Sequence, residues 1–110
     1  MKPAPEPPKK YSQFIERFPK LGEAWEAIHQ AEEEGPLDLR TSRLVKLAVA
    51  IGAFREGAAH AAVRKALKAG ATPEELQQVV VLATATLGMP GAVAAFGWVQ
   101  DVVDKDAKKD

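Results

Sequence analysis

Residues 43–76, RLVKLAVAIGAFREGAAHAAVRKALKAGATPEEL, decide the fold class of this chain. Apolar residues recur along the stretch with the period of an α-helix, and no run alternates with the period of a strand. Gly70 provides a helix stop. After it, Thr72 and Glu75 have the spacing of a capping box around Pro73, which suits the first position of a helix. The stretch therefore predicts three helices in succession.

The same helical period continues on both sides of this stretch. Before it, the sequence predicts a short helix over 11–18 and a second helix with an apolar stripe over 21–34. After it, Pro90 opens a sixth helix that fades after Val103. The chain is therefore predicted to be all-α, a bundle of about six helices in a single domain over 11–104.

The two ends of the chain differ in composition from the predicted domain. Residues 1–10 contain four prolines and no apolar run, which predicts a disordered arm rather than a secretory signal. Residues 105–110 are expected to form a charged tail. The uncharged stretch 76–100 is interrupted by Gly88 and Pro90, so two buried helices explain it better than a membrane span. We expect a cytoplasmic protein.

The composition excludes thiol chemistry and leaves the binding of a small anion open. The 110 residues include no cysteine, which excludes disulfides, thiolate metal sites and thiol redox cycles in this chain. The net charge is zero, but residues 36–72 carry seven basic and two acidic residues, a net charge of +5. This segment can attract a small anion or an acidic neighbouring subunit, or it can be a solvated helix face. Its acidic flanks and its lack of interleaved aromatic residues argue against a nucleic-acid partner.

Glu56 and His60 form the first candidate site. They are one helical turn apart, so their side chains can meet. A carboxylate can orient the imidazole, and such a pair can act as a general acid/base couple. The alternative is a surface ion pair at a helix border, with Arg64 as a third member. His29 is expected to be solvated, and neither a zinc site joining it to His60 nor any other cofactor is predicted.

Four blocks in order resemble the carboxymuconolactone decarboxylase family, which includes the alkyl hydroperoxidase D (AhpD) proteins. These blocks are LVKLAVA (44–50), VRKALKAGAT (63–72), PEEL (73–76) and GMPGAVAAF (88–96). The resemblance covers about residues 37–103. It implies an AhpD-like helical fold that assembles into trimers or hexamers, with sites near subunit contacts. The alanine-rich, widely apolar helices also favour a homo-oligomer.

The resemblance places the family's functional positions on residues of different chemistry. Peroxidase members carry a glutamate, then two cysteines three residues apart, then a histidine four residues later. In this chain Arg43 stands at the glutamate, Arg55 and Ala58 at the cysteines, and Ala62 at the histidine. The family's thiol peroxidase mechanism is therefore not available. The decarboxylase branch uses no thiol, but it expects a histidine at Ala62. His60 points about 200° away from that position on a helix, so it is no simple substitute.

Two arginines suggest what has replaced the thiol site. If the resemblance is followed, Arg43 and Arg55 converge, and Ala58 and Ala62 leave space beside them. Paired guanidinium groups suit a carboxylate or a phosphate. The first functional hypothesis is thus a thiol-independent lyase, isomerase or binder of a small anionic metabolite, with the acid/base couple above transferring a proton.

Two alternatives remain open beside this hypothesis. Both arginines can instead pair with acidic residues of a neighbour, such as Glu74 or Asp101, and act as structural clamps. The whole chain can also be a non-catalytic, oligomeric assembly protein that kept the family's fold and lost its chemistry.

Overall fold

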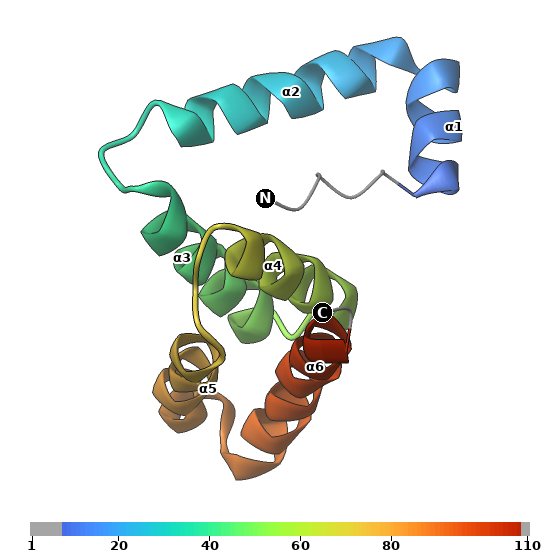
Figure 1. Ribbon diagram of the computed structural model, residues 1–110. Coiled ribbons are helices and arrows are strands. Elements are labelled where there is room, and N and C mark those ends of the chain that lie inside the picture. Colours follow the sequence, from blue (N-terminus) through green and yellow to red (C-terminus); the bar gives the residue numbers. More distant parts are fainter. Residues whose placement is uncertain (1–7, 109–110) are drawn as a thin grey trace. The chain divides into compact units, whose positions relative to one another are not determined.

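The structure, a computed structural model, describes residues 8–108. These residues form six α-helices and no strand, which confirms the all-α prediction. The helices are α1 (Lys9–Arg17), α2 (Pro19–Glu33), α3 (Leu39–Gly52), α4 (Glu56–Lys68), α5 (Pro73–Leu87) and α6 (Met89–Lys108) (Figure 1). The chain divides into two compact units, Met1–Pro36 (unit 1) and Leu37–Asp110 (unit 2), and each is described by itself.

The helix boundaries differ from expectation mainly at the two ends of the chain. Residues 105–108, expected in a charged tail, are the last turn of α6. Lys105 and Lys108 favour this extension because cations are stabilised at the C-terminus of a helix. Residues 9–10 of the expected arm belong to α1, and residues 1–7 lie outside the described part. No helix within residues 8–108 is long and apolar enough to cross a membrane.

Unit 2 has one hydrophobic core, to which all four of its helices contribute. The fully buried side chains are Leu47, Ile51, Ala59, Val63, Ala66, Leu76, Ala95 and Val99. Helix α4 packs against both α3 and α6, and α5 packs against the same two helices. Because α4 contributes mainly alanine to the core, its backbone can approach its neighbours closely. The side chains on the border of α4 are thereby brought next to α6.

Local signals fix where the helices of unit 2 begin and end. The capping box is present: the Thr72 hydroxyl accepts from the Glu75 N–H at 3.2 Å, and the Glu75 carboxylate accepts from the Thr72 N–H at 2.8 Å. Gly70 ends α4 with φ +96°, as predicted. At the start of α3, the Asp38 carboxylate accepts from the Thr41 N–H at 2.8 Å. Hydrogen bonds from Thr41 hold the pKa of Asp38 below its ordinary value.

Two contacts join helices that are far apart in the sequence. Arg40 on α3 donates to both carboxylate oxygens of Glu75 on α5, with Nε 3.3 Å from Oε1. Phe54, just after α3, has a left-handed backbone with φ +57°, and its ring packs on Trp98 of α6 with centroids 4.8 Å apart. Gly91 lies under this ring, since a Cβ added there would be 3.6 Å from Phe54 Cε1 and 3.1 Å from Leu87 Cβ.

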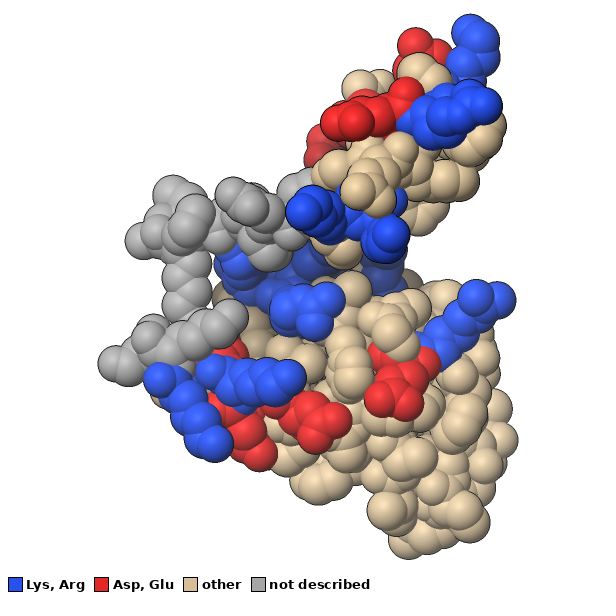
Figure 2. All heavy atoms as spheres, turned by 90° about the vertical axis from the view of Figure 1, so that its right-hand side faces the viewer, with Lys and Arg blue, Asp and Glu red and all other residues tan. Residues whose placement is uncertain are grey.

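Unit 2 exposes a large apolar surface around α5. The most exposed large apolar side chains are Val49, Val81, Leu82, Met89 and Val93, at 64–72%. Leu82 also lines a groove of about 470 Å³ between α3 and α5, together with Leu44, Val45 and Val79. In Figure 2, the lower end of unit 2, where α5 turns into α6, presents no Lys, Arg, Asp or Glu. Helix α5 therefore presents apolar side chains both to the core and to the surface.

Unit 1 consists of α1 and α2, which contact each other without burying a single side chain. Its apolar side chains are about half exposed: Phe14, Phe18, Leu21, Trp25 and Ile28. Gly22 allows the two helices to approach, because a Cβ there would be 3.3 Å from Ile15 Cβ. Two helices of this size have too little buried surface to be stable alone.

Candidate functional site

The position of His60 follows from the buried side of α4. Ala59 and Val63 are fully buried and fix the rotation of the helix about its axis. His60 consequently lies at the border of the buried side, next to α6, and its side chain is only 25% exposed. Glu56 lies one turn earlier and is the first residue of α4. The structure thus brings together the two residues of the predicted acid/base couple.

Two carboxylates surround the His60 imidazole. Nε2 lies 4.0 Å from Glu56 Oε2 and 3.6 Å from Asp101 Oδ2 on α6. Both distances exceed those of a hydrogen bond, which are about 2.7–3.2 Å. Among the described residues Nε2 has no hydrogen-bond partner, although the atom itself is buried. A buried polar atom without a partner is uncommon in proteins, and it points to an arrangement that is completed by another group.

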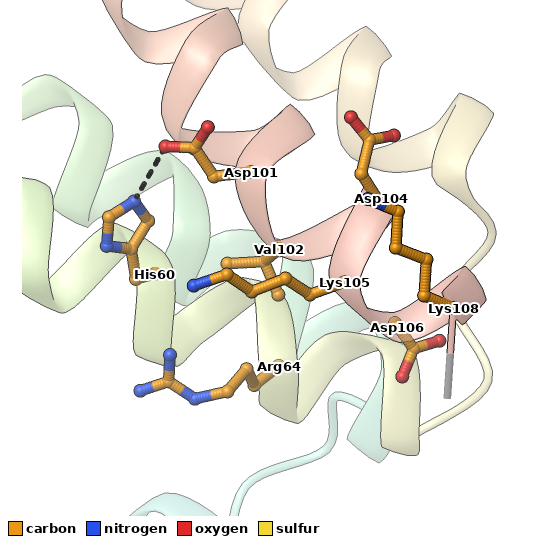
Figure 3. A pocket seen from close by; sticks show the side chains of 8 residues that line it. All are labelled: His60, Arg64, Asp101, Val102, Asp104, Lys105, Asp106 and Lys108. Carbon is orange, nitrogen blue, oxygen red and sulfur yellow. Dashed lines mark ion pairs between the residues drawn. The ribbon is translucent and has the colours of Figure 1, made fainter. Parts of the chain in front are cut away.

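A cavity of about 430 Å³ adjoins this cluster. Its lining comes from α4 and the last turns of α6: His60, Arg64, Asp101, Val102, Asp104, Lys105, Asp106 and Lys108 (Figure 3). Figure 3 shows Asp101 reaching toward His60 from the facing helix. Seven of the eight side chains are ionisable, so the lining suits a polar ligand better than an apolar one.

Within residues 8–108, the carboxylates of this cavity have partners, whereas its Lys and Arg side chains form no ion pair. Asp101 faces His60, Asp104 accepts from Gln100 Nε2 at 3.2 Å, and Asp106 is also engaged. Arg64, Lys105 and Lys108, by contrast, form no ion pair with any other residue of the described range. The only ion pair drawn between the lining residues of Figure 3 joins His60 and Asp101.

The arginines expected from the family positions lie elsewhere. Arg43 is half-buried in the first half of α3, about 14 Å along the helix axis from its last residue at about 1.5 Å per residue. Arg55 is exposed and follows the opposite end of α3, immediately before α4. Ala58 is exposed, and Ala62 is half-buried against the core. Neither arginine lines the cavity beside His60, and their convergence on an anion stays a prediction.

The two histidines of the chain lie in different units. His29 is on α2 of unit 1, where its ring contacts Trp25 with centroids 5.2 Å apart. His60 is on α4 of unit 2. Within the part of the chain that the structure describes, no three His, Asp or Glu side chains are grouped so as to hold a metal ion.

Sequence reasoning missed Asp101 and Lys105 as neighbours of His60. Both lie on α6 beside the buried Val102, so a helical wheel places them at the border of its apolar side. The wheel does not show which helix faces that border. Only the packing of α4 against α6 brings Asp101 to His60.

Comparisons with known proteins agree on one family. The family model described as "Carboxymuconolactone decarboxylase family" matches residues 19–101. The chain is also similar to the crystal structure of apo-lpg0406, a carboxymuconolactone decarboxylase family protein from Legionella pneumophila. The two are 25% identical, with a TM-score of 0.73, and the match covers 84% of this chain and 87% of that one. No curated protein matches the chain.

Proposed function

Because this chain belongs to the carboxymuconolactone decarboxylase family and has no cysteine, we propose that it is a thiol-independent member of that family. It acts as a lyase, an isomerase or a binder of a small anionic metabolite. The observation that carries this proposal is the buried His60 Nε2, which has no hydrogen-bond partner among residues 8–108 and lies between two carboxylates beside a polar cavity.

In this proposal His60 moves a proton to or from the bound molecule. When the bond to a carboxylate breaks and carbon dioxide leaves, the electron pair of that bond stays on carbon, and a positioned imidazolium can donate the proton that completes the step. Asp101 is a positioning residue, because its carboxylate faces Nε2 and orients the ring. Glu56 is about as exposed as Asp101, but it lies farther from Nε2, at 4.0 Å against 3.6 Å, so its contribution is the smaller one.

Turnover of carboxymuconolactone tests the proposal. We expect decarboxylation or isomerisation by the purified chain, insensitive to thiol-alkylating reagents. In His60→Gln we expect a loss of about 100-fold or more, because general acid/base catalysis contributes about 10²–10⁴-fold. His29→Gln is the matched control and retains the rate, since the His29 ring contacts Trp25 and is not part of the cavity lining. An unchanged rate in His60→Gln contradicts the role of this residue.

The exposed apolar surface of α5 supports a second candidate function. Five large apolar side chains on unit 2, two of them on α5, are at least 64% exposed, and exposed apolar side chains of this kind are typical of protein–protein contacts when they lie together. In this reading the chain is a homo-oligomeric assembly protein, a trimer or a hexamer, that has lost the family's chemistry. Native mass spectrometry gives the subunit number. Absence of turnover together with an unperturbed His60 NMR signal in the presence of carboxymuconolactone favours the assembly role over the enzyme.

A further inference from the structure

We infer that the cavity between α4 and α6 is an oxyanion site, in which Arg64 and Lys105 hold the carboxylate or phosphate group of a small molecule. This inference rests on the proposed function, because it names the group by which a ligand is held beside His60. It also moves the expected anion contacts away from Arg43 and Arg55, the two positions that the family pattern indicates.

The two helices present the same arrangement across the cavity. Arg64 follows His60 by one turn on α4, and Lys105 follows Asp101 by one turn on α6. Residues four apart on a helix lie on the same side. Since His60 and Asp101 face each other at 3.6 Å, the next turn of each helix brings its cation to the same cavity. In Figure 3 the Lys105 ammonium extends toward α4, away from Asp104 and Asp106.

The lining of the cavity carries three carboxylates and three Lys or Arg side chains, and two of these cations can share an anion. Arg64 and Lys105 line one cavity, and neither has an ion-pair partner among residues 8–108. Two cations that face one space repel each other, whereas an oxyanion placed between them accepts charge-assisted hydrogen bonds from both. The three carboxylates of the lining compete poorly for this role, because Asp101 faces His60, Asp104 accepts from Gln100, and Asp106 is also engaged.

The size of the cavity fits a small metabolite. Its volume of about 430 Å³ falls within the range of about 300–1,000 Å³ that is usual for small-molecule sites. The guanidinium of Arg64 offers two parallel donors to one oxyanion, and Lys105 adds a point charge. A ligand held in this way lies beside the His60 ring, where the proposed proton transfer takes place.

Titration of the full chain with inorganic phosphate and with succinate, followed by calorimetry and by NMR of the Arg64 side chain, tests the site. We expect Arg64→Gln/Lys105→Gln to weaken binding by at least tenfold. Lys46→Gln/Lys65→Gln changes the net charge equally and should alter binding by less than twofold. Binding of succinate but not phosphate identifies a carboxylate ligand, and the reverse identifies a phosphate. Failure of the wild type to bind either anion overturns the inference.

Two further variants keep this test separate from that of the proposed function. His60→Gln should bind the anion within about threefold of the wild type, so a loss of turnover in this variant does not reflect lost binding. Arg43→Gln/Arg55→Gln tests the positions that the family pattern indicates. If this variant loses anion binding while Arg64→Gln/Lys105→Gln retains it, or if all three charge-changing variants weaken equally, the Arg64–Lys105 site is overturned.

Discussion

Thr72 shows how a single hydroxyl fixes the start of a helix. Its side chain accepts the Glu75 N–H, and this bond satisfies one of the free donors at the start of α5. We predict that Thr72→Ala lowers the free energy of unfolding by about 1 kcal/mol, the usual value for a lost N-cap. Urea denaturation measures the change. Thr86→Ala, at an exposed position later in the same helix, is the control, and an equal loss in both variants contradicts a capping role.

Asp38 gives the stability of unit 2 a dependence on pH. Its pKa in the folded chain is below the ordinary value of 3.8, because Thr41 donates hydrogen bonds to the carboxylate. The ionised group therefore stabilises the fold above the ordinary pKa, and this contribution is lost as the pH falls through the lower, folded pKa. We predict that Asp38→Asn is less stable than the wild type at neutral pH and that the difference vanishes in acid. Thermal unfolding across pH 2–7 measures it, and a constant difference contradicts the assignment.

The first turn of α6 depends on a glycine. A Cβ at Gly91 would lie 3.1 Å from Leu87 Cβ, closer than neighbouring side chains normally allow, whereas a Cβ at Gly97 would meet nothing within 4 Å. We predict that Gly91→Ala destabilises unit 2 by about 1–3 kcal/mol through overpacking. Gly97→Ala should be neutral or stabilising by up to about 1 kcal/mol, since alanine is the better helix former. Chemical denaturation compares the two, and similar values for both would disprove steric crowding at Gly91.

The helices were predictable where their signals are local. The start of α5 is indicated by Thr72, Pro73 and Glu75, and the end of α4 is indicated by Gly70. Such signals can be identified in the sequence because caps and turns depend on neighbouring residues. The end of α6 was not predictable in the same way. Its last turn contains only charged residues and alanine. This composition is common both in the last turn of a helix and in a solvated tail.

The candidate site was predictable only within one helix. Glu56 and His60 are four residues apart, so helical geometry alone brings them together. Asp101 is forty-one residues beyond His60, and its approach depends on the packing of α4 against α6. The apolar pattern shows that both helices have a buried side, but many pairings of buried sides satisfy the same pattern. Long-range contacts of this kind therefore need the structure.

At the scale of the whole molecule, α5 carries exposed apolar side chains that we propose as a contact between copies of the chain. Leu82 is 72% exposed and lines the groove between α3 and α5. If this surface is covered in a homo-oligomer, a buried lysine without a partner costs several kcal/mol. We predict that Leu82→Lys shifts the protein to monomers in native mass spectrometry, while Ala107→Lys, at an exposed position near the end of α6, retains the assembly. An intact oligomer in Leu82→Lys places the interface elsewhere.

The absence of buried side chains from α1 and α2 has a consequence for the amide hydrogens of unit 1. Two helices that bury no side chain between them open and close easily, so their backbone amides exchange with deuterated water almost as fast as those of an unfolded chain. Slow exchange in residues 9–33 therefore requires that another protein surface covers Phe14, Trp25 and their apolar neighbours. The exchange rate of these amides, measured at several protein concentrations, therefore reports how long the contact with that covering surface lasts.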